Sequence, residues 1–295
     1  MKNKLIFLSF LLFSLTLFKY TNKNNEKLNN NYSNLKIDKL DNIDKIYKYE
    51  KINFLTFKSI KPIPNGLGVV LGDIESHMPD GHIYVASDKV TWAHETTHGI
   101  NSVLRNKHSK INTIFKTATE YRPVYGGGSV NAFYVLKNRY IVIKEPNVKI
   151  SDIAENIPES LRGRSYDLYL INQQNDWNDY PLYIFDEWSA YTNGAACHLD
   201  LKINDRSDSI LSMFNFNVYS ICVAMTVKEQ DKNYDDKELK AFLRWNIERS
   251  FEYLNNDSLS MEYLEKIEKE DDAKKFRKFC VDYFGPEWTK KYFNF

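Results

Sequence analysis

The segment from Thr91 to Ile100 constrains the fold of this chain more than any other stretch, because it contains the pattern His-Glu-x-x-His. In a helix, residues four apart lie on one face, so the imidazoles of His94 and His98 can reach a single metal ion. Glu95 lies beside the first histidine and can reach a water molecule next to that ion. A chain of this length gives roughly 0.01 accidental matches to the pattern. The pattern predicts a metal-binding helix; the alternative is a surface helix with two solvated histidines.

Length and composition are those of a soluble globular protein. The chain has 295 residues, of which 43% are hydrophobic and 27% charged, enough for one large domain or two small ones. Its formal net charge of +1 gives no strong field that would draw it to nucleic acid or anionic lipid, so we expect no nucleic-acid partner; a protein or peptide substrate is what the resemblance described below implies. The 3 cysteines, Cys197, Cys222 and Cys280, are odd in number and form no Cys-x-x-Cys pair, which disfavours a cysteine metal site.

The first 20 residues are typical of a secretory leader. Lys2 and Lys4 precede an apolar run from Leu5 to Phe18 that is short for a membrane span. We therefore expect a signal peptide over 1–20, a secreted protein and no membrane span in the mature chain, with an uncleaved anchor as the alternative. Residues 21–50 read as a polar spacer and docking segment, because the Asn- and Lys-rich part has little apolar surface to bury.

The catalytic domain is expected over 51–295. Its first part, 51–125, should hold a sheet and the metal helix. Apolar residues from Gly66 to Ile74 predict a buried strand, and alternation from His82 to Ala86 predicts a second one. Ser87-Asp88 then provides a cap for a helix that continues to about Asn106.

The second part, 126–295, is expected to hold a hairpin insertion and a mostly helical remainder. Phe133–Leu136 and Arg139–Ile143 flank Lys137-Asn138, which predicts a β-hairpin with a two-residue turn. Further predictions are a helix from Ser151 to about Leu161, a loop over 172–180, a helix from Tyr183 to about Leu201, and a helical cap from segments 207–229, 235–255 and 260–284. The predicted class is α+β, with a small mixed sheet packed on the metal helix.

A protein zinc site needs a third ligand besides the two histidines. We favour Glu187, which lies in a long predicted helix between bulky apolar residues and close to small ones. Glu120 is an alternative, although its surroundings, Thr-Glu-Tyr-Arg-Pro, break a helix. His198 on about the same helix face is a second alternative, and His108 is expected to be a solvated surface residue.

These motifs resemble gluzincin-type zinc metallopeptidases, and most of all the secreted bacterial group that includes anthrax lethal factor and the Pro-Pro endopeptidases. The metzincin pattern is excluded, because Asn101 and Leu104 stand where that class has Gly and His. The resemblance covers 94–98 strongly and 180–191 moderately. The gap between His98 and Glu187 is longer than in the group.

The resemblance implies a zincin-like fold and one catalytic zinc ion held by His94, His98 and Glu187. It implies peptide hydrolysis with Glu95 as general base. In this group a tyrosine about two turns before the third ligand steadies the oxyanion, and here that position holds Tyr180; Tyr183 and Tyr191 are the rival positions. The alternative function is a catalytically inactive secreted zinc-binding or adhesion protein on the same fold.

Overall fold

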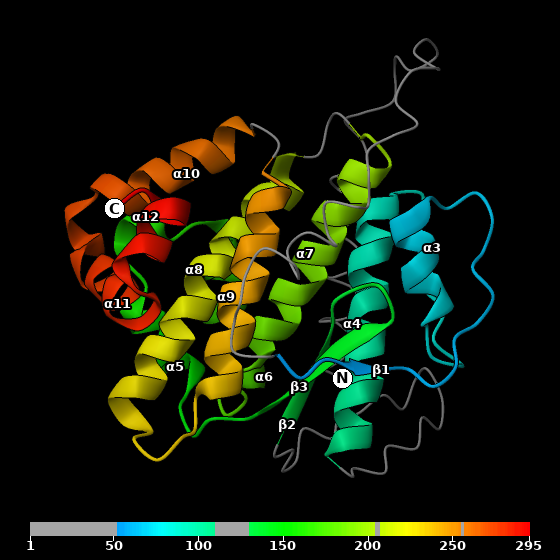
Figure 1. The fold of residues 1–295 in the computed structure, drawn as a ribbon, viewed down its shortest axis with the longest axis horizontal. Coiled ribbons are helices and arrows are strands. Elements are labelled where there is room, and N and C mark those ends of the chain that lie inside the picture. Colours follow the sequence, from blue (N-terminus) through cyan, green and yellow to red (C-terminus); the bar gives the residue numbers. More distant parts are fainter. Residues whose placement is uncertain (1–51, 110–129, 204–206, 255–256) are drawn as a thin grey trace. The chain divides into compact units, whose positions relative to one another are not determined.

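The computed structural model describes residues 52–109, 130–203, 207–254 and 257–295, which belong to one compact unit, Asp38–Phe295 (Figure 1). The predicted signal peptide and spacer, and Glu120, lie outside these residues. The strands are β1 (Leu55–Thr56), β2 (Val130–Tyr134) and β3 (Arg139–Lys144). The helices are α3 (Val69–Ser76), α4 (Lys89–His108), α5 (Ile150–Asn156), η1 (Glu159–Leu161), η2 (Tyr166–Asn172), α6 (Gln174–Trp177), α7 (Tyr183–Asp200), α8 (Ser207–Gln230), α9 (Lys237–Glu252), α10 (Ser258–Lys269), η3 (Asp271–Ala273), α11 (Lys274–Phe284) and α12 (Pro286–Phe293). The predicted α+β class is confirmed.

The sheet of the described residues has three strands in the order β1-β3-β2, and both pairs are antiparallel, so the prediction of a mixed sheet is wrong. The hairpin is confirmed, with Val130 opposite Lys144, but the predicted two-residue turn is wrong, because residues 135–138 separate β2 from β3. Its turn places Leu136, Lys137 and Asn138 at positive φ, a costly conformation for residues other than glycine. Asp73 of α3 steadies the turn by accepting a hydrogen bond from the Lys137 backbone N–H at 2.9 Å.

The two strands predicted before the metal helix are wrong. The 66–74 segment forms helix α3 from Val69 onward, and residues 82–86 belong to no strand ladder within the described ranges. The reason for the helix is a tertiary contact. The Asp200 carboxylate, at the end of α7, accepts hydrogen bonds from the backbone N–H groups of Val69 at 2.7 Å and Val70 at 3.0 Å, which caps the first turn of α3.

Helix α4 begins where its cap predicts. The Asp88 side chain accepts hydrogen bonds from the backbone N–H groups of Val90 and Thr91, and the helix continues to His108. Helix α4 packs against α7, against β2 and against α3 (Figure 1). Helix α7 confirms the predicted helix from Tyr183, and nearly every one of its residues is buried, because α8 covers the side that α4 leaves open.

The C-terminal half is helical, but its helices do more than cap the core. Helix α8 lies inside the core, against α5, α7 and α9, and the prediction of a cap is wrong for this helix (Figure 1). Its stretch Ser209–Gln230 is apolar and long enough to cross a membrane. Within this stretch, 89% of an apolar window of 18 residues is buried inside the protein, as in a core helix. The segment predicted as one helix over 260–284 is divided into α10 and α11 by η3.

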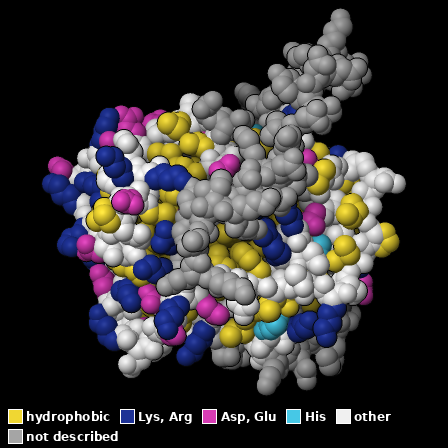
Figure 2. Space-filling model, in the orientation of Figure 1, with side chains coloured by type: hydrophobic (Ala, Val, Ile, Leu, Met, Phe, Trp, Pro, Cys, Tyr) yellow, Lys and Arg dark blue, Asp and Glu magenta, His cyan; other side chains and the backbone are white. Residues whose placement is uncertain are grey.

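The predicted helix from Ser151 to Leu161 is also divided. Helix α5 begins at Ile150 without a side-chain cap and ends at Asn156, and η1 follows. Ile157 is extended because it precedes Pro158, which disfavours the helical region for the residue before it. The predicted 172–180 loop contains the short helix α6. On the face drawn in Figure 2, charged side chains of both signs are interspersed.

Candidate metal centre

The three predicted ligands meet where α4 crosses α7. His94 Nε2 lies 3.0 Å from His98 Nε2, and Glu187 Oε2 lies 3.6 Å from the former atom and 3.5 Å from the latter. The two helices cross closely at this point. A Cβ added to Gly194 of α7 would lie 3.6 Å from the Val90 carbonyl oxygen and 3.9 Å from the Cβ of His94.

The two sides of this triangle that end at Glu187 have about the length expected around a tetrahedral metal ion, and the side between the histidines is shorter. Ligand distances of 2.0–2.2 Å to zinc and a tetrahedral angle place neighbouring ligand atoms about 3.3–3.5 Å apart. The Glu187 carboxylate is only 4% exposed, and its Oε2 has no hydrogen-bond partner among the described residues, although a buried carboxylate oxygen is costly to leave unpaired. Its Oε1 accepts a hydrogen bond from the Tyr183 hydroxyl at 2.7 Å. The group His94, His98 and Glu187 could therefore hold a metal ion.

Asp186 supports the site from behind His98. Its Oδ1 lies 3.3 Å from His98 Nδ1 and accepts a hydrogen bond from Asn101 Nδ2 at 2.5 Å. Asn101 is fixed in turn, because its Oδ1 accepts from the Tyr134 backbone N–H at 2.7 Å. A carboxylate on Nδ1 leaves Nε2 as the ligand atom and fixes the plane of the ring. The sequence patterns did not predict this role of Asp186.

Charge at the centre follows from the same contacts. Burial opposes protonation of His98, but the carboxylates of Glu187 and Asp186 outweigh it and raise the pKa of His98 well above its ordinary value. Burial also acts on Glu95, raising its pKa together with the two carboxylates, while His98 opposes the shift. The carboxylates around the triangle therefore favour positive charge there.

Glu95 lies on α4 beside the ligand face. Its carboxylate forms no hydrogen bond within the described residues, and the side chain is partly exposed. It also stands outside the ligand group of His94, His98 and Glu187. The carboxylate is therefore available to a water molecule or a bound substrate.

Two of the three tyrosines considered from sequence contact the ligands. Tyr183 donates to Glu187 and stacks on Trp177, with ring centroids 3.9 Å apart. The Tyr191 ring packs edge-on against His94 at 4.4 Å, and its hydroxyl pairs with that of Tyr169 at 2.8 Å, a contact that sequence spacing did not predict. Tyr180 lies three residues before the start of α7, and its carbonyl accepts a hydrogen bond from the Tyr183 N–H at 3.0 Å. Its role as oxyanion donor stays a prediction.

The other residues considered as ligands are placed elsewhere. His198 is 7% exposed, its Nδ1 lies 3.4 Å from the Ser209 hydroxyl, and it is not part of the ligand group, so the alternative of His198 as third ligand is wrong. His108 lies 3.2 Å from the Tyr140 hydroxyl. The three cysteines are free and buried, and burial raises the pKa of Cys197 to about 12, which makes it a poor nucleophile.

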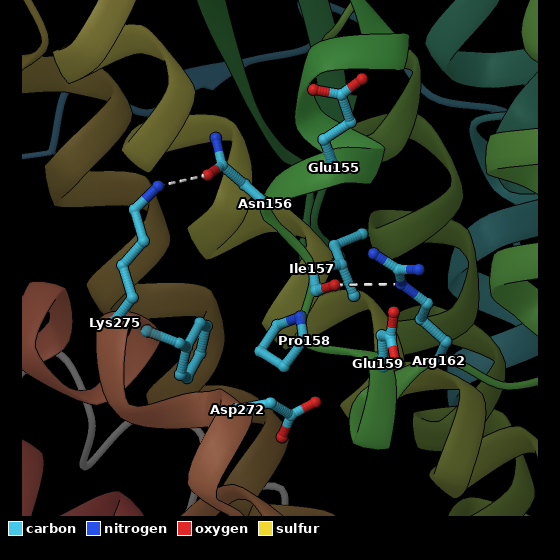
Figure 3. Close-up of a pocket in the computed structure, with 9 residues that line it drawn as sticks. Glu155, Asn156, Ile157, Pro158, Glu159, Arg162, Asp272 and Lys275 are labelled. Carbon is cyan, nitrogen blue, oxygen red and sulfur yellow. Dashed lines mark hydrogen bonds between the residues drawn. The ribbon is translucent and has the colours of Figure 1, made fainter.

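A cavity of about 330 Å³ lies apart from the ligand group. Residues of α5, η1, η3 and α11 line it, and it shares none of them with the metal centre (Figure 3). Its polar groups bond within the protein: Lys275 Nζ donates to Asn156 Oδ1 at 2.7 Å, and Arg162 Nε donates to the Ile157 carbonyl at 3.0 Å. The cavity adds nothing to the chemistry of the centre.

No protein-family model matches the chain, and comparisons with curated proteins and with solved structures give no significant match.

Proposed function

We propose that this protein is a secreted zinc metallopeptidase of the zincin type that hydrolyses peptide bonds, with Glu95 as general base. The observation that carries the proposal is the triangle of two imidazole nitrogens and Glu187 Oε2, which accepts no hydrogen bond from the described residues. It lies beside the Glu95 carboxylate, which also has no hydrogen bond within the described residues. His94, His98 and Glu187 would hold one zinc ion, and the substrate would be a protein or peptide.

When bound, zinc supplies Lewis acidity: it makes water acidic near neutral pH and polarises a carbonyl group. Glu95 accepts the proton of the attacking water and delivers it to the leaving amine. Tyr180 donates its hydroxyl to the oxyanion that develops on the scissile carbonyl. Tyr183 and Asp186 keep Glu187 and His98 in the geometry that binds the ion.

The test combines zinc analysis with a cleavage screen over a peptide library. We expect about one zinc per chain, lost when His94 and His98 are both replaced by Ala, because Glu187 alone cannot hold the ion. Glu95→Gln should keep zinc and lose at least about 10²–10⁴-fold in kcat, since it removes the group that moves the proton.

Each other outcome points to a different function. Zinc without hydrolysis would support the inactive zinc-binding or adhesion protein. Full zinc occupancy in the protein without both histidines, or normal turnover of Glu95→Gln, would refute the proposal.

A further inference from the structure

His82 lies against the metal helix, although no motif points to it. Its imidazole occupies the space that a side chain at Gly99 would fill: a Cβ added there would lie 2.7 Å from Cε1, 2.7 Å from Nε2 and 2.8 Å from Nδ1 of the ring. Gly99 directly follows the ligand His98 and lies one turn after Glu95, on the same side of α4. The absence of a side chain at Gly99 therefore lets the imidazole sit next to the Glu95 face.

The chain from His82 to Asp88 follows that face toward the start of the helix. The segment follows Gly81, which has a positive φ, and its side chains alternate between half-buried and exposed. Ile83 is 83% exposed, whereas His82 and Tyr84 turn inward. Burial raises the pKa of Tyr84 to about 12, with the charges of Glu95 and Asp88 adding to the shift, which agrees with a phenol beside the Glu95 face. The packing of His82 on Gly99 and the electrostatic influence of Glu95 on Tyr84 place both side chains near the Glu95 face of α4.

The imidazole of His82 has unused hydrogen-bonding capacity. Its Nε2 is buried and has no partner, and its side chain forms no hydrogen bond to the described residues. A neutral imidazole offers one donor and one acceptor. A turn about the Cβ–Cγ bond breaks no hydrogen bond to these residues.

The surroundings of His82 are open on the outer side. Among the described residues, several large hydrophobic side chains that are more than two-fifths exposed precede α4 in the chain: Ile60, Ile63, Val69, Ile83 and Val85. Figure 2 has hydrophobic side chains on the side where Figure 1 places α3. A peptide that reaches Glu95 along this side passes the imidazole.

We propose that His82 is a further substrate-binding residue of this centre, and that its imidazole turns on Gly99 to hydrogen-bond the backbone of the peptide whose scissile bond lies at Glu95. The inference rests on the proposed function, since it assigns the imidazole to the substrate of that site. A hydrogen bond of this kind contributes about tenfold in binding, and more if it strengthens as charge develops on the peptide carbonyl.

The experiment uses the full zinc-loaded chain and four variants: His82→Ala, His82→Gln, Gly99→Ala and the double variant His82→Ala/Gly99→Ala. His108→Ala, on the last turn of α4, is the matched control histidine. Three quantities are measured for each protein. They are the zinc affinity by competition with a chromophoric chelator, kcat/KM for the best peptide of the library, and hydroxamate binding by calorimetry, as the Kd of a dipeptide hydroxamate and that of acetohydroxamate.

His82→Ala should lower kcat/KM roughly 10–100-fold and weaken the dipeptide hydroxamate about tenfold, and His82→Gln should recover part of both because it keeps a donor and an acceptor. Zinc affinity should stay within twofold, as should the binding of acetohydroxamate, which has no peptide. Gly99→Ala should act like His82→Ala, because its methyl group would displace the His82 ring. Alanine itself is favourable at a helical position, so the helix should be retained. In the His82→Ala background, Gly99→Ala should cause no further loss of kcat/KM or of dipeptide hydroxamate binding.

Two results would overturn the inference. One is a His82→Ala protein with normal kcat/KM and normal dipeptide hydroxamate binding, while Glu95→Gln is inactive. The other is an equal loss in His108→Ala, which would reduce the effect to helix stability. Failure of the proposed function is recognised separately, by a wild-type chain without zinc or by full turnover of Glu95→Gln.

Discussion

Replacing Asp186 by Ala tests whether the metal centre depends on its outer contacts. Asp186 is 5% exposed, and its Oδ1 reaches His98 Nδ1 at 3.3 Å. Removing an outer carboxylate from a ligand histidine typically costs 10–100-fold in metal affinity, or about 1.4–2.7 kcal/mol. The upper half of this range is expected here, because Asn101 cannot turn to replace the carboxylate: its own oxygen is held by the Tyr134 N–H at 2.7 Å.

Asp186→Asn is the milder partner of this variant. It keeps an acceptor for His98 and for Asn101 but removes the charge, so its loss of zinc affinity should be about tenfold or less. Zinc affinity is measured by chelator competition, and folding by thermal melting of the metal-free proteins. The control is Glu75→Ala. Glu75 is a buried carboxylate that accepts hydrogen bonds from Trp92 and Thr96 of helix α4, the helix that carries His98, but it is not one of the ligand group.

The control should lower the melting temperature and leave zinc affinity within about threefold. The reasoning fails if Asp186→Ala binds zinc as tightly as the wild type, or if Glu75→Ala loses as much zinc affinity as Asp186→Ala. In the second case, the loss would reflect a looser helix α4 and not the orientation of His98.

Further predictions concern the ligands, the tyrosines and Glu145. Glu187→Ala should lose zinc on gel filtration and His198→Ala should retain it, as measured by metal analysis. Tyr180→Phe should lower kcat on the order of 10²–10³-fold with KM unchanged in steady-state kinetics, whereas Tyr183→Phe should weaken zinc in chelator competition by roughly tenfold. Burial raises the pKa of Glu145 to about 8, so the folded state keeps a proton that the unfolded state releases above about pH 4. The free energy of unfolding should therefore fall as the pH rises toward 8, by at most about 1.4 kcal/mol per pH unit. Denaturant titrations at about pH 5 and pH 8 should show this fall in the wild type and not in Glu145→Gln.

Local chemistry made part of this structure predictable. The Asp88 cap, the spacing of His94 and His98, and the helix that carries Glu187 depend on interactions between residues a few positions apart, which sequence patterns record. The hairpin around Asn138 is local in the same way. The α+β class and two of the three ligands in the metal group followed from these short-range rules.

Contacts between distant segments decided the rest. The segment from Gly66 has the composition of a strand, but Asp200, more than a hundred residues later, caps its first turn and makes it a helix. The sequence favoured Glu187 as third ligand but kept Glu120 and His198 as alternatives. The crossing of α4 and α7 brings Glu187 to the histidines, whereas His198 lies beside Ser209. Pairings across such distances depend on how the helices pack, because the shape and burial that bring these groups together arise only when the chain has folded.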